Sequence, residues 1–252
     1  MKIGVTERGD AGIDFTWVNK LKNRTIDGAI LITKNVNDTF IKNVMDLYKN
    51  GFTQIIVHCT CTGHGRTIIE PNVPDYKTTL SQLKKLIDNG FPKTQCVLRI
   101  DPIIPTPDGI KKMTDVIEEA YAIGLLPDLR IRISIMDEYK HVKERFKQVG
   151  IGPLYGDKFY APFSMINNLK ATLDKYDLQF ECCAEPYVSN KNQFIHIGCV
   201  SERDLQIMKL NYEKNFVNPQ NRKGCLCLGC KTELLELRQR CPHKCLYCFW
   251  KD

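Results

Sequence analysis

The chain has 252 residues, of which 43% are hydrophobic and 26% are charged. This length and composition are sufficient for one large α/β domain, or two small ones, with a buried core, and they exclude a disordered protein. The formal net charge of +7 could attract phosphates or nucleic acid, although a solvated surface rich in lysine explains it equally well.

Strand and helix patterns alternate along most of the chain. Short apolar runs, typical of strands buried on both faces, are separated by helical repeats of about ten to fifteen residues. The expected strands cover residues 3–5, 28–33, 54–59, 96–100, 129–136 and 179–183, with a seventh within 231–240. The expected helices are centred on residues 15–21, 40–47, 80–87, 110–117, 142–146 and 166–173. Such alternation indicates βαβ units in a parallel sheet, and seven strands suggest a closed α/β barrel or a partial, TIM-like barrel.

Several polar residues follow the ends of these expected strands. They are Lys34, His64, Asp101, Asp137 and Glu185. Parallel α/β barrels assemble their sites at the C-terminal ends of the strands. We therefore expect these side chains to meet at one mouth, with His64 on an exposed loop.

Half of the twelve cysteines lie beyond residue 224. The N-terminus has no apolar signal-peptide core, and no run approaches the length of a membrane span. A cytoplasmic protein with reduced thiols is therefore expected, and the crowding suggests metal ligands. We expect residues 1–210 to form the barrel. Residues 211–252 would add its last strand and a cysteine loop, within one integrated domain.

The most specific motif is the loop Cys241, Cys245 and Cys248, with Tyr247 just before the last cysteine. This C-x3-C-x2-C spacing follows neither helical nor strand periodicity. A short loop of this kind can hold three irons of a four-iron cluster while the fourth iron has no protein ligand.

A structural zinc site is the alternative. Cys227-x2-Cys230 and Cys245-x2-Cys248 form two pairs at a separation close to that of a zinc ribbon. That interpretation leaves Cys225 and Cys241 without a role.

The motif resembles the cluster loop of radical S-adenosylmethionine (SAM) enzymes. Those enzymes usually carry it near the start of the barrel, so the chain resembles a circularly permuted member, and nearly its whole length is similar to one bacterial family of such proteins. The supporting segments are Thr33-Lys34-Asn35, Glu70-Pro71-Asn72-Val73-Pro74, Arg99-Ile100-Asp101-Pro102-Ile103, Cys183-Ala184-Glu185, Gly198-Cys199 and Cys225-Leu226-Cys227.

The resemblance implies a [4Fe–4S] cluster on Cys241, Cys245 and Cys248, with SAM on its open iron. It also implies roles in cofactor binding for Arg8, Asp10, Lys34 and Tyr247. Arg8 and Asp10 lie in the first turn, where a carboxylate could accept the methionine ammonium. A solvated turn explains these two residues equally well.

Four further cysteines match the family pattern and would suffice for a second [4Fe–4S] cluster. They are Cys183, Cys199, Cys225 and Cys227. The alternative is that Cys182, Cys183 and Cys199 are small buried residues, as free cysteines often are. Cys230 could substitute as a ligand, whereas Cys59, Cys61 and Cys96 are expected in the core.

The candidate catalytic residues are Glu70, Arg99, Asp101 and Glu185. Arg99 and Asp101 are two residues apart on one strand face and are expected to pair. They would bind the ribose or carboxylate of SAM, or simply neutralise each other. Glu70 lies in a loop stiffened by prolines, which could hold its carboxylate over the mouth.

The sequence thus predicts an enzyme that cleaves SAM reductively to a 5′-deoxyadenosyl radical and takes hydrogen from an unidentified substrate. A flavodoxin or ferredoxin would donate the electron. Basic and aromatic residues near the cysteines suggest a nucleotide or single-stranded nucleic acid as substrate. They are Arg222, Lys223, Arg238, Arg240, Lys244, Tyr247, Phe249 and Trp250. The competing hypothesis is a nucleic-acid- or protein-binding module with a structural zinc or iron–sulfur site.

Overall fold

The structure is a computed structural model of residues 1–252 and describes all of them except 190–191, 212–223, 237–240 and 250–252. Its strands are β1 (Ile3–Val5), β2 (Gly28–Thr33), β3 (Ile55–Thr60), β4 (Cys96–Ile103), β5 (Arg130–Ile135), β6 (Phe180–Cys183), β7 (Phe194–Ile197) and β8 (Lys231–Glu233). Its helices are α1 (Thr16–Lys22), α2 (Asp38–Lys49), α3 (Tyr76–Asp88), α4 (Pro107–Ala122), α5 (Lys140–Gln148), α6 (Phe163–Leu173) and α7 (Glu202–Ile207), with a short 3-10 helix at Lys93–Gln95.

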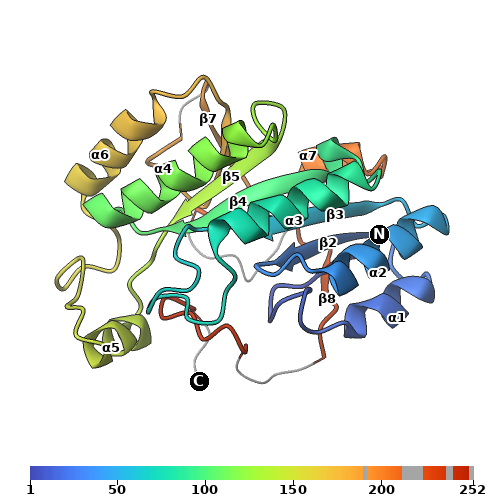
Figure 1. The fold of residues 1–252 in the computed structure, drawn as a ribbon, viewed down its shortest axis with the longest axis horizontal. Coiled ribbons are helices and arrows are strands. Elements are labelled where there is room, and N and C mark those ends of the chain that lie inside the picture. Colours follow the sequence, from blue (N-terminus) through green and yellow to red (C-terminus); the bar gives the residue numbers. More distant parts are fainter. Residues whose placement is uncertain (190–191, 212–223, 237–240, 250–252) are drawn as a thin grey trace.

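The eight strands form one parallel sheet in the order β7-β6-β5-β4-β3-β2-β1-β8 (Figure 1). The expected α/β fold with a parallel sheet is confirmed. β7 was not predicted, and the last strand covers only Lys231–Glu233 of the expected range, whose residues 237–240 lie outside the described part of the chain. β8 comes from the cysteine-rich segment and pairs with β1, so that segment adds a strand to the same sheet.

Local capping explains where the long helices begin. Asn37, Asp75 and Thr106 accept a backbone N–H in the first turn of α2, α3 and α4, respectively. Such side-chain caps satisfy donors that have no partner within the helix. Asp38 is the first residue of α2 and follows its cap, Asn37.

The two faces of the sheet carry different side chains. One face, with Leu31, Val57, Leu98 and Ile133, packs in the main hydrophobic cluster with residues of α1–α4 and α6. On the opposite face Ile3, Val5, Ile30, Ile56 and Val97 pack against α7 and against Leu228 and Cys230. Because successive side chains of a strand point to opposite faces, a second, smaller core forms on the face opposite the main cluster.

The segment before β8 contacts the end of β7. Leu228 N donates to Val200 O over 3.0 Å, and His196 Nε2 lies 2.7 Å from Gly224 O. Gly198 permits this approach, because a Cβ there would lie 2.6 Å from the backbone nitrogen of Cys227. Residues 224–230 thus run beside the chain that follows β7 and then continue into β8.

None of the helices in the described part of the chain is long and apolar enough to cross a membrane.

Candidate functional site

The C-terminal cysteine loop is a compact turn. Lys244 N donates to Cys241 O and Cys248 N donates to Cys245 O, over 3.1 and 3.2 Å. Lys244 adopts a left-handed conformation with φ of 53°. Cys245 is buried, whereas Cys241 and Cys248 are partly exposed. One thiol of the turn is therefore inside the protein, and the other two are at its surface.

The three thiols lie close enough to influence one another. Burial raises the pKa of Cys241 to about 11, and the charges of Asp10 and Cys248 add to that effect. Burial also raises the pKa of Cys245, which the neighbouring Lys34 opposes. A bound cation would be needed to hold these thiols as thiolates, which is the state that ligates iron.

The loop is docked on two parts of the fold. Asn72 Nδ2 donates to Pro242 O over 2.7 Å, and Leu246 N donates to Ile69 O over 3.0 Å. From α5, Arg145 Nη1 donates to Cys248 O over 2.5 Å. The loop is therefore held by the segment around Glu70 and by α5, which both follow C-terminal ends of strands.

A buried histidine on the loop contacts the first turn of the chain. His243 Nε2 lies 2.8 Å from Asp10 Oδ2. Asp10 also accepts from Gly12 N (2.7 Å), Thr33 Oγ1 (2.5 Å) and Lys34 N (2.6 Å). His243 was not predicted, although its position between Cys241 and Cys245 was a signal. The role of Asp10 toward the methionine ammonium stays a prediction.

Glu70 is a buried acceptor for three side chains. Lys34 Nζ donates to it over 2.8 Å, Thr62 Oγ1 donates over 2.7 Å, and the Tyr247 hydroxyl donates to the same carboxylate. Lys34 Nζ also lies 5.2 Å from the centre of the Tyr247 ring. Burial alone would lower the pKa of Lys34, but Glu70 and Cys245 outweigh it and the pKa is raised. A fixed cation thus lies beside the cysteine loop.

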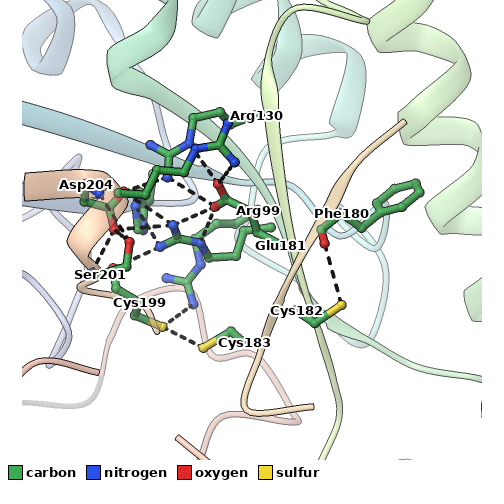
Figure 2. A network of polar contacts seen from close by, with 12 residues as sticks. Arg99, Arg130, Phe180, Glu181, Cys182, Cys183, Cys199, Ser201 and Asp204 are labelled. Atoms are coloured by element: carbon green, nitrogen blue, oxygen red, sulfur yellow. Dashed lines mark hydrogen bonds and ion pairs between the residues drawn. The ribbon is translucent and has the colours of Figure 1, made fainter. Parts of the chain in front are cut away.

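The structure brings together the four cysteines expected to hold a second cluster. Cys183 ends β6 and Cys199 follows β7, and their sulfurs are 3.0 Å apart (Figure 2). Cys199 N donates to Cys227 Sγ over 3.0 Å. The pKa of Cys225 is lowered to about 7 by a hydrogen bond from the Cys227 thiol, and that of Cys227 to about 7 by hydrogen bonds from Cys183 and Cys199. We call these residues the four-cysteine group.

This donor set fits a soft metal or an iron–sulfur cluster, because it consists of thiols alone. The 3.0 Å separation of Cys183 and Cys199 is shorter than the ~3.8 Å between two thiolates on one tetrahedral zinc, given Zn–S bonds of about 2.3 Å. Among the described residues no group of three or more His, Cys, Asp or Glu side chains is arranged to hold a metal ion as it stands. Binding would require the thiols to move apart.

The predicted pair Arg99 and Asp101 forms an ion pair on β4. Asp101 also accepts from Ser134 Oγ, and Arg99 Nη2 lies 3.8 Å from Cys199 Sγ. Arg99 and Asp101 therefore adjoin the four-cysteine group. Their roles toward SAM or substrate stay predictions.

A buried charged network continues from this pair and was missed in the sequence. Arg132 donates to Glu181 and to Cys199 O, over 2.6 and 2.9 Å. Asp204 accepts from Arg130 over 2.7 Å. Burial and the nearby arginines lower the pKa of His58, whose Nε2 lies 3.4 Å from Arg132 Nη1. These charged residues lie among apolar residues in the strand patterns of the sequence. Their ion pairs depend on the register of the sheet, which the sequence does not show.

The other predicted site residues have simpler surroundings. Glu185 accepts from Ile135 N over 2.8 Å, just beyond the ends of β5 and β6. The backbone N–H of Arg8 donates to Glu233 over 3.0 Å, and Arg8 is exposed. His64 is only 2% exposed, so the expectation of an exposed loop histidine was wrong: its loop is a tight turn in which Thr67 N and Thr67 Oγ1 donate to His64 O. Their catalytic or binding roles stay predictions.

The remaining cysteines help to weigh the zinc-ribbon alternative. Cys59, Cys61 and Cys96 are buried in the main core, as expected. Cys230 packs with Ile3 and Leu228, whereas Cys245 packs with Tyr247 in a different hydrophobic cluster. The two cysteine pairs of the proposed ribbon thus belong to separate parts of the fold, which disfavours it.

Most of the basic residues expected to bind nucleic acid lie outside the described residues. They are Arg222, Lys223, Arg238 and Arg240, and Trp250 lies outside as well. Lys244 is exposed, and Phe249 is 52% exposed. Tyr247 is buried beneath Lys34, so its ring has no free face for a base.

The sequence model of a family described as a domain of unknown function (DUF1848) matches residues 15–250. No curated protein matches the chain.

Proposed function

The chain belongs to the DUF1848 family, and because that description assigns no activity, we propose from the site itself that the protein is a radical SAM enzyme with two [4Fe–4S] clusters. The observation that carries this proposal is the docking of the loop Cys241–Cys248 against Lys34, Glu70 and Asp10. A motif with cluster spacing is thereby fixed where parallel sheets present their sites.

A [4Fe–4S] cluster on Cys241, Cys245 and Cys248, with SAM on its open iron, would supply the reductive cleavage of SAM and the radical that removes hydrogen from a substrate. The protein supplies the rest. Lys34 places a positive charge beside Cys245, and this charge offsets those of the thiolates. Val73, Ile104, Met136 and other apolar residues pack around Cys245 and Tyr247, which keeps water from these two side chains.

The surroundings of the predicted cofactor-binding residues refine their roles. The oxygens of Asp10 already receive three donors besides His243. We therefore assign Asp10 to positioning the cysteine loop. Lys34 and Tyr247 meet at Glu70, so this carboxylate orients both. Arg8 remains the exposed cation of the first turn for the carboxylate of SAM.

Among the proposed catalytic residues, Asp101 is the more accessible member of its pair. Its side chain is 21% exposed, against 9% for Arg99. Glu185 is partly exposed and follows β6 directly. We propose that Asp101 and Glu185 contact the substrate. Arg99 and Glu70 are more deeply buried and orient the side chains that they contact.

We also propose that the sheet curls into a permuted partial barrel. The edge strands β7 and β8 are joined through residues 224–230, which bond to Val200 and then continue into β8. Ile3 N donates to Cys230 O over 2.9 Å at the other side of this segment. Such a connection would place the four-cysteine group between the edge strands β7 and β8, where it could relay electrons from a flavodoxin or ferredoxin.

The substrate class that we propose is a nucleotide or single-stranded nucleic acid, supported by the net charge of +7 and by the exposed Lys244 and Phe249. Cluster-loaded protein should bind single-stranded DNA, RNA or nucleotides with an affinity that falls as salt rises. If polyphosphate binds as tightly as any ligand that contains a base, or if nothing binds at low salt, the substrate is of another class.

Anaerobic reconstitution followed by iron, sulfide and zinc analysis tests the enzyme against a binding module with structural zinc. We expect about eight irons per chain, from two four-iron clusters. Cys245→Ala should lose about four irons and all SAM cleavage, and Cys225→Ala should lose the other four. Cys230→Ser is the matched control and should keep both. Zinc without iron, or full SAM cleavage by Cys245→Ala, would refute the proposal.

A further inference from the structure

Arg99 contacts the four-cysteine group directly. Its Nη2 lies 3.8 Å from Cys199 Sγ, and its side chain is 9% exposed (Figure 2). Its Nε is buried and has no hydrogen-bond partner among the residues that the structure describes. Burying an arginine with an unused donor is costly. A negatively charged group held by the cysteines would offset this cost.

A second arginine fixes the backbone of the same cysteine. Arg132 Nη1 donates to Cys199 O over 2.9 Å, and the Arg132 side chain is fully buried between Glu181 and Asp204. Cys199 is therefore held at its carbonyl by Arg132 while its sulfur faces Arg99. The backbone of Cys199 is thus fixed relative to β5, and its sulfur lies beside Arg99.

The charges around Cys199 do not cancel evenly. Arg130 and Arg132 are matched by Glu181 and Asp204, and these four side chains are at most 7% exposed. Arg99 is matched by Asp101, which is 21% exposed and more strongly screened by water. The Arg99 guanidinium, 3.8 Å from the Cys199 sulfur, therefore presents a positive charge to it, and the partner carboxylate of Arg99 is the more exposed member of their pair.

We propose that Arg99 is a positioning residue that raises the reduction potential of the cluster in the four-cysteine group, and so makes this cluster the entry point for electrons. This role rests on the second cluster of the proposed function. A hydrogen bond to a ligating sulfur and a nearby positive charge both stabilise the reduced, more negative form of a cluster. In the step itself a low-potential flavin or iron–sulfur protein loses one electron and the cluster gains it. No covalent bond changes and no proton moves.

The test isolates this cluster. The full-length chain with Cys241, Cys245 and Cys248 all replaced by alanine keeps only the four-cysteine group, and an electron paramagnetic resonance redox titration then reports one potential. In this background Arg99→Gln should lower the equilibrium constant for reduction about tenfold, which is ~59 mV for a one-electron couple. Arg99→Lys keeps the charge and should shift the potential less. Arg203→Gln is the matched control, because Arg203 Nη1 donates to Glu181 at 3.0 Å and the same network is altered away from the cysteines.

Asp101→Asn gives an effect of opposite sign. It removes a negative charge beside Arg99, so the reduction potential should rise. If the Arg99→Gln protein does not bind iron, the potential of Asp101→Asn tests the role of Arg99 instead. An Arg99→Gln protein with four irons and an unchanged potential, or an Asp101→Asn protein whose potential does not rise, would overturn the role of Arg99 alone. A triple-alanine background that binds no iron would overturn the second cluster and this role together.

Discussion

His243 Nε2 lies 2.8 Å from Asp10 Oδ2, and both side chains are 3% exposed although the residues are 233 positions apart. This contact joins the cysteine loop to the turn that follows β1. Because His243 stands between Cys241 and Cys245, its position sets that of two proposed ligands. The contact therefore aligns the loop with the turn that follows β1.

His243→Ala should loosen the loop without unfolding the protein. A hydrogen bond to a buried charged group contributes about 1.5–3 kcal/mol, and its loss should appear as faster release of iron to a chelator. Chelation kinetics and the free energy of unfolding measure the two effects separately. Asp75→Ala is the matched control, because it removes the cap of α3 at a cost of about 1 kcal/mol and should leave iron release unchanged. Equal chelation rates for His243→Ala and wild type would show that the contact does not align the loop.

Tyr247 and Glu70 should be energetically coupled. The Tyr247 hydroxyl donates to Glu70, which also accepts from Lys34. In a double-mutant cycle of Tyr247→Phe and Glu70→Gln we expect a coupling of about 0.5–3 kcal/mol in the free energy of unfolding, as for other residues in one network. Thr62→Val with Tyr247→Phe provides a comparison through the same carboxylate. Strict additivity of Tyr247→Phe and Glu70→Gln would mean that the phenol does not help to hold the loop.

The alternation of strands and helices was predictable because apolar runs bounded by turns report burial directly. β7 was missed because its four residues include His196 and are too few for a clear period. The meeting of Cys183 with Cys199 depends on β7, so sequence spacing could not show it. The spacing of the last three cysteines was informative because the ligands of one loop are close in sequence.

The pairing of polar residues was harder to predict. Arg132 and Glu181 lie opposite each other on β5 and β6, a relationship set by register. In the sequence Arg132 is one of two arginines that alternate with isoleucines, and Glu181 is a single charge in an otherwise apolar strand. His243 likewise gains its partner only when the C-terminal loop reaches the first turn. Contacts between distant segments carry no local signature.

Arg132→Met should destabilise the fold strongly. Arg132 is fully buried and pairs with Glu181 and Asp204. Removing one member of a buried charged group leaves the others uncompensated, at a cost of about 3–5 kcal/mol. Chemical denaturation of the metal-free protein measures this loss. Arg203→Met is the control, because that side chain is 44% exposed and contacts the same Glu181. Water screens an exposed guanidinium, so its removal should cost about 0–1 kcal/mol. Similar losses in both variants would show that burial of the network does not determine its contribution.

Asp204 should make the free energy of unfolding depend on pH in the acidic range. Burial alone would raise its pKa, but Arg132, Arg130 and Ser201 outweigh burial, and the pKa in the folded state lies below 3.8. The folded protein therefore favours the ionised carboxylate. Its contribution to the free energy of unfolding is complete well above pH 3.8 and is lost as the pH falls through the folded pKa.

The variant Asp204→Asn isolates this contribution, since asparagine is neutral at every pH. The variant should be less stable than wild type near neutral pH, and the difference should shrink as the pH falls below 3.8, where Asp204 itself becomes protonated. Both proteins are compared without metal, because thiolate–metal bonds are themselves lost in acid. Denaturant titrations at several pH values give the difference in unfolding free energy. A difference that stays constant or grows on acidification would mean that the arginines do not hold Asp204 in its ionised form.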